Sequence, residues 1–259
     1  MGKKLKIVVL AKQVPDTRNV GKDAMKADGT VNRAALPAIF NPEDLNALEQ
    51  ALTIKDMREG SEVYILTMGP VRAADVIRDA VFRGADGGYL LTDRAGAGAE
   101  TLATSYALSR ALKESKPDII VAGREAIDGD TAQVGPQVAE KLGLPQVTYA
   151  EQIVRLTDKE IVIKRRLDNG VETVSSPYPM VMTVNGSAPE CRPMNAKRVM
   201  KYKHAKTRSE LQDAGEDYMV QLLEARGYLK ITEWNVGDID ADPNQLGLLG
   251  SPTKVKQIE

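Results

Sequence analysis

Short apolar runs alternate with amphipathic stretches through the first 150 residues of this chain. The β-branched runs predict buried strands over Lys6–Ala11, Val63–Met68, Gly88–Thr92, Ile119–Gly123 and Gln146–Thr148. The stretches between them carry apolar residues at helical spacing over Glu43–Arg58, Ala73–Arg83, Glu100–Ser115 and Thr131–Leu142. Such alternation is typical of a doubly wound, mostly parallel sheet. We therefore predict an α/β fold.

A different pattern follows in the next part of the chain. Tight turns join three runs that predict an antiparallel meander over Glu151–Thr157, Glu160–Arg166 and Val171–Val174. The run Pro179–Val184 is predicted to return to the main sheet. We expect an irregular, basic segment from Gly186 to Thr207 and a short helix around Glu216–Arg226.

The last 25 residues, Asn235–Glu259, are rich in Asp, Asn, Gly and Pro and lack an apolar period. A tail of that kind, with no core of its own, is usually disordered or lies on a partner. We therefore predict one Rossmann-like domain over residues 1–234, with an antiparallel insertion at about 151–184, followed by this tail.

Composition excludes several classes of protein. The 35 basic and 36 acidic residues nearly cancel, and only two Phe, one Trp and eight Tyr are present, so nucleic-acid binding is not expected. Cys191 is the single cysteine, which fits a reducing compartment. The apolar run Ile7–Ala11 is too short for a signal peptide or a membrane span. We expect a soluble, cytoplasmic protein.

The segment Ile119–Pro136 is the strongest pointer to a ligand. Its apolar strand ends at Gly123, a small acidic loop follows, and a helical pattern opens near Thr131. Loops of this kind hold nucleotides, because glycines permit close approach and the first helical turn offers free N–H groups to an anion. The spacing matches neither G-x-G-x-x-G nor G-x-x-x-x-G-K-[ST]. An ordinary crossover without a ligand stays open as the alternative.

Pro136 complicates the start of that helix, because proline removes a backbone N–H. Either the first turn after Thr131 is distorted or the regular helix starts at Gly135-Pro136. In both cases the N–H groups from Gly129 to Val134 are predicted to face a ligand.

Other strand ends are expected at the same edge of the sheet, since ligands of such folds bind beyond the carboxyl ends of the strands. These ends are Leu10-Ala11-Lys12 and Thr67-Met68-Gly69-Pro70. Asn41-Pro42 is predicted to cap and start a helix beside them. The cations Lys12 and Arg124 are predicted to balance phosphate charge.

Few residues are candidates for catalysis. His204 is the only histidine and lies among lysines, which excludes histidine triads and predicts a surface side chain. Cys191 has Arg192 beside it, but a passive thiol is favoured. Asp128 and Asp130 are interpreted as helix-capping or ribose-contacting groups rather than as an acid–base pair.

A metal site has less support. Asp16, Asp44 and Glu125 carry suitable oxygen ligands, but nothing in their spacing demands a metal ion. We therefore assign no catalytic and no metal-binding residue.

Taken together, these segments resemble the β subunit of electron transfer flavoproteins. The matching segments are Val9–Thr17, Phe40–Asp44, Leu66–Pro70, Gly123–Gln137 and Gly250–Thr253. The resemblance implies a heterodimer whose α subunit carries a redox FAD, and a Rossmann-like β domain that holds an adenine nucleotide. With the strand ends above, it implies a cofactor site made of Leu10, Ala11, Lys12, Asn41, Pro42, Met68, Gly123, Arg124, Ala126, Ile127, Asp128, Gly129, Asp130, Thr131, Gln133 and Val134.

The family has two branches, which differ in the ligand of this site. One branch binds a structural AMP and supports electron transfer from acyl-CoA dehydrogenases. The anaerobic branch binds a second FAD, which takes a hydride from NADH and bifurcates the electrons. One electron passes to ferredoxin or flavodoxin, and the other passes through the α-subunit FAD. Gly129 and Thr131 resemble the bifurcating branch, so FAD is our leading prediction and AMP the alternative.

A third possibility is a stand-alone ATP-using enzyme of a related fold. It would need a Ser/Gly-rich phosphate loop after the first strand, and Lys12-Gln-Val-Pro15 is unlike one.

Two further segments gain expected roles from the resemblance. The loop Asn185–Asn195 corresponds to a partner-docking loop, within a docking region of about 185–205, but it lacks the leucine that anchors acyl-CoA dehydrogenases. A quinone-linked flavoprotein is therefore as good a candidate partner, with Met194 as a possible anchor. The tail Asn235–Glu259 resembles an arm wrapped over the α subunit.

Overall fold

The computed structural model describes residues 2–16, 37–214, 220, 221, 223 and 225–253. Its main feature is a nine-stranded sheet with the order β11-β5-β4-β1-β6-β10-β7-β8-β9. The strands of the parallel part are β1 (Lys6–Leu10), β4 (Glu62–Met68), β5 (Gly87–Leu91), β6 (Ile119–Gly123), β7 (Gln146–Leu156), β10 (Met180–Val184) and β11 (Thr232–Trp234). The predicted doubly wound α/β fold is confirmed.

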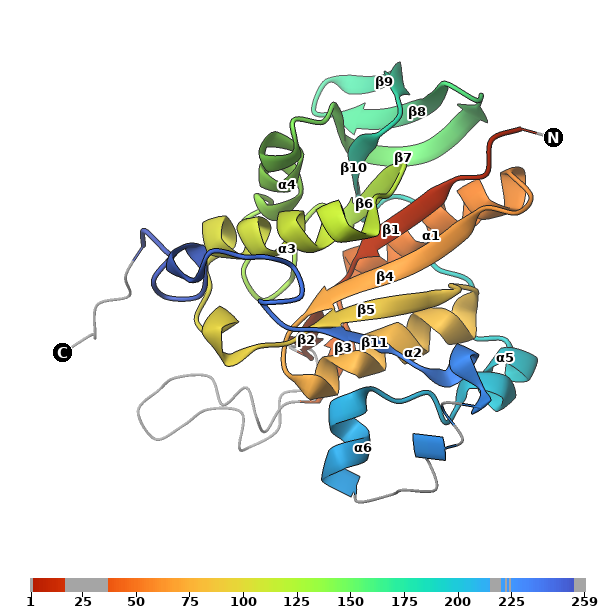
Figure 1. Cartoon of the computed structure of the whole chain (residues 1–259). Helices are drawn as coiled ribbons and strands as arrows, with labels where there is room; N and C mark the ends of the chain where they lie inside the picture. Colours follow the sequence, from red (N-terminus) through yellow and green to blue (C-terminus); the bar gives the residue numbers. More distant parts are fainter. Residues whose placement is uncertain (1, 17–36, 215–219, 222, 224, 254–259) are drawn as a thin grey trace.

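Helices cover both faces of this sheet (Figure 1). The helices α1 (Pro42–Met57) and α2 (Ala74–Arg83) bury one apolar face, which includes Ile7, Leu48 and Ile77. The helices α3 (Thr101–Ser115) and α4 (Val134–Leu142) bury the other, around Val8 and Leu112. The central strands are apolar on both faces because they are covered on both sides.

The antiparallel meander is also confirmed. The strand β7 pairs antiparallel with β8 (Glu160–Leu167), and β8 pairs antiparallel with β9 (Gly170–Pro177). The strand β10 returns to the main sheet and lies parallel to both β6 and β7. One expectation needs correction, because the two strands predicted over 146–148 and 151–157 are a single strand. Tyr149, at a φ of 58°, interrupts its apolar pattern without ending it.

Several short elements escaped the sequence analysis. They are the two-stranded pair β2 (Gln13–Pro15) and β3 (Ala38–Phe40), the strand β11, and the helices α5 (Ala196–Tyr202) and α6 (Arg208–Ala214). The expectation of an irregular segment from 186 to 207 is therefore wrong over α5. The helix expected around Glu216–Arg226 lies largely outside the described residues, although Val220, Gln221, Leu223 and Ala225 are helical.

The described part of the tail packs on this chain. Ile239 and Leu246 are buried in the same apolar cluster as α3 and α4. Arg110 of α3 donates to the Ile239 carbonyl at 3.1 Å, and the Tyr106 hydroxyl accepts from the Asp242 N–H at 2.9 Å. The prediction was a tail that is disordered or lies on a partner. The described residues 235–253 pack on this chain through two apolar residues, and contact with an α subunit stays a prediction.

A membrane-spanning role finds no support in the helices that the structure describes, since none of them combines the required length and apolarity.

Candidate functional site

A cleft opens where the order of the strands reverses. The strand β1 pairs with β4 on one side and with β6 on the other, so the connections leaving β1 and β6 run to opposite faces of the sheet. Such a switch point is where ligands bind in open α/β sheets. The cleft has a volume of about 1200 Å³ and lies beyond the carboxyl ends of β1, β4, β5 and β6.

Thirteen of the sixteen predicted site residues line this cleft. They are Leu10, Ala11, Lys12, Met68, Gly123, Arg124, Ala126, Asp128, Gly129, Asp130, Thr131, Gln133 and Val134. Asn41, Pro42 and Ile127 are not part of the wall, so the expectation that they line it is not met. Ile127 directs its N–H away from the cleft, toward the Asn41 side chain.

The predicted helix start at Asn41-Pro42 is confirmed, but the Asn41 side chain has a different task from capping. Asn41 is the N-cap residue of α1, but its side chain makes no capping hydrogen bond. Its Nδ2 instead donates to the Glu125 carbonyl at 2.9 Å, and its Oδ1 accepts from the Ile127 N–H at 3.2 Å. Asn41 is fully buried, and its two hydrogen bonds hold the loop after β6 on the side away from the cleft.

Asp44, on the first turn of α1, joins the ends of the two central strands. Its Oδ2 accepts from the Lys12 N–H at 2.8 Å, and its Oδ1 accepts from the Gly123 N–H at 3.1 Å. Burial raises the pKa of this carboxyl to about 7, although both N–H groups favour the ionised form. The metal-ligand role considered for Asp44 finds no support, since the described residues hold no group of three potential metal ligands.

The loop between β6 and α4 presents backbone donors to the cleft. The helix α4 begins at Val134, so Pro136 falls within its first turn. The N–H groups of Gly129 and Asp130 are bound to the Ala126 carbonyl at 3.1 and 2.9 Å, so these two are not free, contrary to the prediction.

The backbone N–H groups that follow in the sequence are not occupied in this way. Among the described residues, the N–H groups of residues 131 to 134 have no hydrogen-bond partner. Asp130 and Ala132 have positive φ angles of 48° and 51°, which gives the loop the alternating backbone of an anion-binding concavity. Neither Asp128 nor Asp130 caps α4, because Gln133 is the N-cap residue and no side chain caps that helix.

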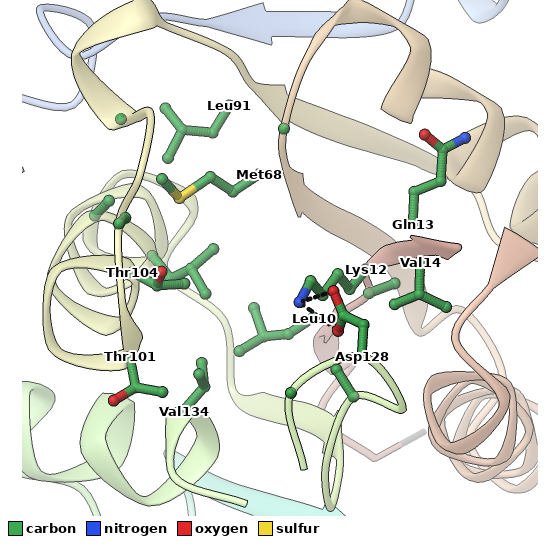
Figure 2. A pocket seen from close by; sticks show the side chains of 18 of the residues that line it. Leu10, Lys12, Gln13, Val14, Met68, Leu91, Thr101, Thr104, Asp128 and Val134 are labelled. Carbon is green, nitrogen blue, oxygen red and sulfur yellow. Dashed lines mark hydrogen bonds and ion pairs between the residues drawn. The ribbon is translucent and has the colours of Figure 1, made fainter. Parts of the chain in front are cut away.

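Lys12 and Asp128 meet in the middle of the cleft (Figure 2). The Nζ of Lys12 lies 2.6 and 2.9 Å from the two carboxylate oxygens of Asp128. Half of the Lys12 side chain is exposed, while only 10 % of the Asp128 side chain is. The lysine therefore neutralises a carboxylate that belongs to the wall of the cleft.

Arg124 also forms ion pairs with carboxylates. Its guanidinium is 3.0 Å from the Glu43 carboxylate and also pairs with Glu125. Both cations that were predicted to balance phosphate thus already face carboxylates. Any anion in the cleft depends first on the backbone donors at the start of α4.

The cleft also has a wall that sequence reasoning missed. Figure 2 shows Leu91, Thr101 and Thr104 beside Met68 and Val134, with Gln13 and Val14 on another side. Leu91 ends β5, so the rule about carboxyl ends would have found it. Thr101 and Thr104 open α3 one helical turn apart, a spacing that points both side chains in one direction.

The remaining candidates behave as passive groups. Burial raises the pKa of the Cys191 thiol to about 12, which disfavours the reactive thiolate. Arg192 does not activate it, because its guanidinium pairs with Glu49 and Asp56. His204 is exposed, as expected.

The fold and the site define a class: a doubly wound α/β protein with a large cleft at the switch point of its sheet. Residues 28–207 match the family model described as electron transfer flavoprotein domain. The electron transfer flavoprotein subunit beta of Clostridium acetobutylicum is 42 % identical over 98 % of this chain and 87 % of its own length. The chain belongs to the electron transfer flavoprotein family, as a subunit of the β type.

Two other relatives carry more specific names. The caffeyl-CoA reductase-Etf complex subunit CarD of Acetobacterium woodii is 41 % identical over 97 % of this chain and 86 % of its own length. The acryloyl-CoA reductase electron transfer subunit gamma of Anaerotignum propionicum is 47 % identical over 69 % of this chain and 67 % of its own length.

Proposed function

We propose that the cleft binds FAD and that this chain, with an electron transfer flavoprotein α subunit, takes a hydride from NADH and bifurcates the electrons. One electron goes to ferredoxin or flavodoxin, and the other goes to a higher-potential dehydrogenase or quinone-linked partner. A flavin supplies the change between two-electron and one-electron transfer, while this chain binds and orients it. The complex acts in the cytoplasm, where a single half-buried thiol such as Cys191 stays reduced.

The extent of the cleft carries this proposal. It continues from the loop after β6 past Met68 to Leu91 and to Thr101 at the start of α3. Its volume of about 1200 Å³ exceeds the range of roughly 300–1,000 Å³ that is common for small-ligand pockets. A mononucleotide uses only part of such a cleft, whereas a dinucleotide uses its length.

The chemistry of the wall fits an adenine dinucleotide. The free N–H groups of residues 131 to 134 suit a pyrophosphate. No atom lies within 4 Å of the position that a Cβ at Gly129 would take, so the loop leaves space beside these donors. Leu10, Met68 and Leu91 offer an apolar surface to a flat ring.

Relatives of this chain support the same assignment. CarD and the acryloyl-CoA reductase subunit are named as parts of reductase complexes. We extend to this chain the association with an α subunit and a reductase or dehydrogenase.

The alternative function is that of a non-bifurcating β subunit. In this case the cleft binds AMP as a structural ligand, and the subunit supports electron transfer from acyl-CoA dehydrogenases. The backbone donors of residues 131 to 134 favour this ligand equally, because a single phosphate also fits the start of a helix.

Counting the ligands separates the two functions. The heterodimer is purified and denatured, and the released FAD and AMP are quantified. We expect two FAD per heterodimer and bleaching of flavin absorbance when NADH is added without oxygen. One FAD with one AMP, or a flavin spectrum that NADH leaves unchanged, would overturn the bifurcation proposal.

The docking loop, Asn185–Asn195, is held in place by side chains of α1. The Asn46 Nδ2 donates to the carbonyls of Ala188 and Pro189 at 2.9 Å each, and Glu49 pairs with Arg192, so α1 holds the loop. Met194 follows with 43 % exposure. If Met194 is the anchor, Met194→Ala weakens capture of the partner dehydrogenase in a pull-down. Undiminished capture would remove Met194 from the docking site.

A further inference from the structure

The first turn of α1 holds the loop after β6 through side chains. The Gly123 N–H donates to the Asp44 Oδ1 at 3.1 Å, and the Glu125 N–H donates to the Glu43 Oε2 at 2.9 Å. The Ile127 N–H donates to the Asn41 Oδ1 at 3.2 Å. Three alternate residues of the loop are therefore bound to three acceptors on one helical turn, as a strand is bound to its neighbour.

This alternation fixes what the loop offers to the cleft. The N–H groups of Gly123, Glu125 and Ile127 face α1, while the residues from Gly123 to Ala126 and Asp128 line the cleft, where the Asp128 carboxylate meets Lys12. A shift by one residue would turn the Asp128 side chain away from Lys12. The three acceptors therefore set the register in which Asp128 reaches Lys12.

Gly123 permits this close approach. A Cβ at this position would lie 2.8 Å from the carbonyl carbon of Glu43 and 2.9 Å from the backbone N of Asp44, closer than real Cβ contacts. Asn41 and Asp44 are buried, with exposed fractions of 0 % and 7 %. Neither Asn41 nor Glu43 lines the cleft. Asp44 does line it, but its two carboxylate oxygens accept from the Lys12 and Gly123 N–H groups.

We propose that Asn41, Glu43 and Asp44 are positioning residues that hold the cleft in its binding shape before a ligand arrives. The inference rests on the proposed nucleotide site and adds how its affinity is set. A ligand that meets a preformed loop does not have to order it, which favours binding. Without the three acceptors the loop loses its register, and the ligand must restore it.

The test uses Asn41→Asp in the full chain, purified with its α subunit and freed of bound nucleotide. The variant keeps an acceptor for the Ile127 N–H. It replaces the Asn41 Nδ2, which donates to the Glu125 carbonyl oxygen at 2.9 Å, by a carboxylate oxygen that repels this carbonyl. AMP and ADP are the probes in calorimetry. We expect a loss of affinity of roughly ten-fold or more, with faster amide exchange at residues 123–128.

Asn46→Ala is the matched control. Asn46 is buried on the same helix and also donates from its side chain to loop carbonyls, those of Ala188 and Pro189, away from the cleft. Its removal should lower the unfolding temperature while it leaves the AMP and ADP affinities within about two-fold. Glu43→Gln, which keeps an acceptor for the Glu125 N–H, serves as the second variant if Asn41→Asp does not fold, with an expected smaller loss in affinity.

The outcomes separate this inference from the proposed function. If the unaltered protein binds AMP and ADP and a folded Asn41→Asp or Glu43→Gln variant binds them equally well with unchanged amide exchange, the positioning role is wrong. An equal loss of affinity in Asn46→Ala would also overturn it, because general destabilisation would then suffice. If the unaltered protein binds neither nucleotide, the proposed function fails first.

Discussion

Lys12 and Asp128 illustrate how single residues set the charge of the cleft. The lysine follows β1 and the aspartate lies in the loop after β6, yet their charged atoms are 2.6 Å apart. An unpaired carboxylate at this place would repel a phosphate, and an unpaired ammonium would attract it. The pair leaves the cleft close to neutral at this point.

A double-mutant cycle tests this neutralising role. We expect Lys12→Met to weaken AMP or ADP binding roughly ten-fold, because Asp128 is then unbalanced, and Asp128→Asn to strengthen it. The double variant should bind about as the unaltered protein does. If it binds as weakly as Lys12→Met, the lysine contacts the phosphate directly.

Asp44 predicts a dependence of stability on pH. Its pKa is about 7 in the folded chain against an ordinary value of 3.8, so between these pH values the folded state holds a proton that the unfolded state has released. The contribution of this carboxyl to stability is therefore greatest at acidic pH and falls as the pH rises toward 7.

Asp44→Asn removes this titration. Urea unfolding of both proteins at about pH 5 and about pH 8 should show the unaltered protein losing roughly 2 kcal/mol relative to the variant over that interval. A difference in unfolding free energy that does not change with pH would mean that the carboxyl titrates normally.

At the scale of elements, Gly135 controls how close α4 comes to β10. A Cβ at this position would lie 2.5 Å from the Thr183 Cγ2. The helix therefore rests on the sheet at the point where its N-terminus faces the cleft.

Gly135→Ala should lower the free energy of unfolding by about 1–3 kcal/mol, since it overpacks this contact. Thr183→Ser removes the methyl group and keeps the hydroxyl that accepts from the Tyr149 N–H. Adding it to Gly135→Ala should recover most of the loss. A double variant that is no more stable than Gly135→Ala would show that the close contact is not the cause.

The same scale shows why some elements could be predicted and others could not. The strands β1, β4 and β6 could be predicted because most of their residues are apolar or β-branched over a buried length. The strands β2, β3 and β11 have three residues each, too few for a period. The helix α5 was hidden by its basic composition, although Asn195, which accepts from the Lys197 and Arg198 N–H groups, was a readable capping signal.

The site was predictable in the same uneven way. The loop from Gly123 to Val134 could be located because glycines and a helix start follow an apolar strand. The role of Asn41 could not, because a residue before a helical proline predicts a cap and not a partner for a distant loop. The pairing of Lys12 with Asp128 depends on the strand order, which no local pattern contains.

At the scale of the whole molecule, the tail belongs to the fold as well as to any interface. Ile239 is fully buried against the face that α3 and α4 cover, whereas Leu249 is 80 % exposed. The arm predicted over 235–259 thus has an anchored part and an exposed part. Contact of the exposed part with an α subunit stays a prediction.

Ile239→Ala should lower the unfolding free energy of this chain by about 2–5 kcal/mol through the cavity that it leaves. Leu249→Ala should change it by less than about 0.5 kcal/mol and is the matched control. Equal thermal stability of the two variants would show that the tail does not pack on its own domain.

The strand order also has a consequence for synthesis. The two walls of the cleft come from β1 and from a neighbour that starts more than a hundred residues later, at Ile119. A nascent chain that has only its first two crossovers therefore has no cleft, however well its early helices have formed. β6 also needs β10, which comes later still, as its other neighbour. The cleft, and with it the proposed ligand site, therefore forms only after β6 and β10 have joined the sheet.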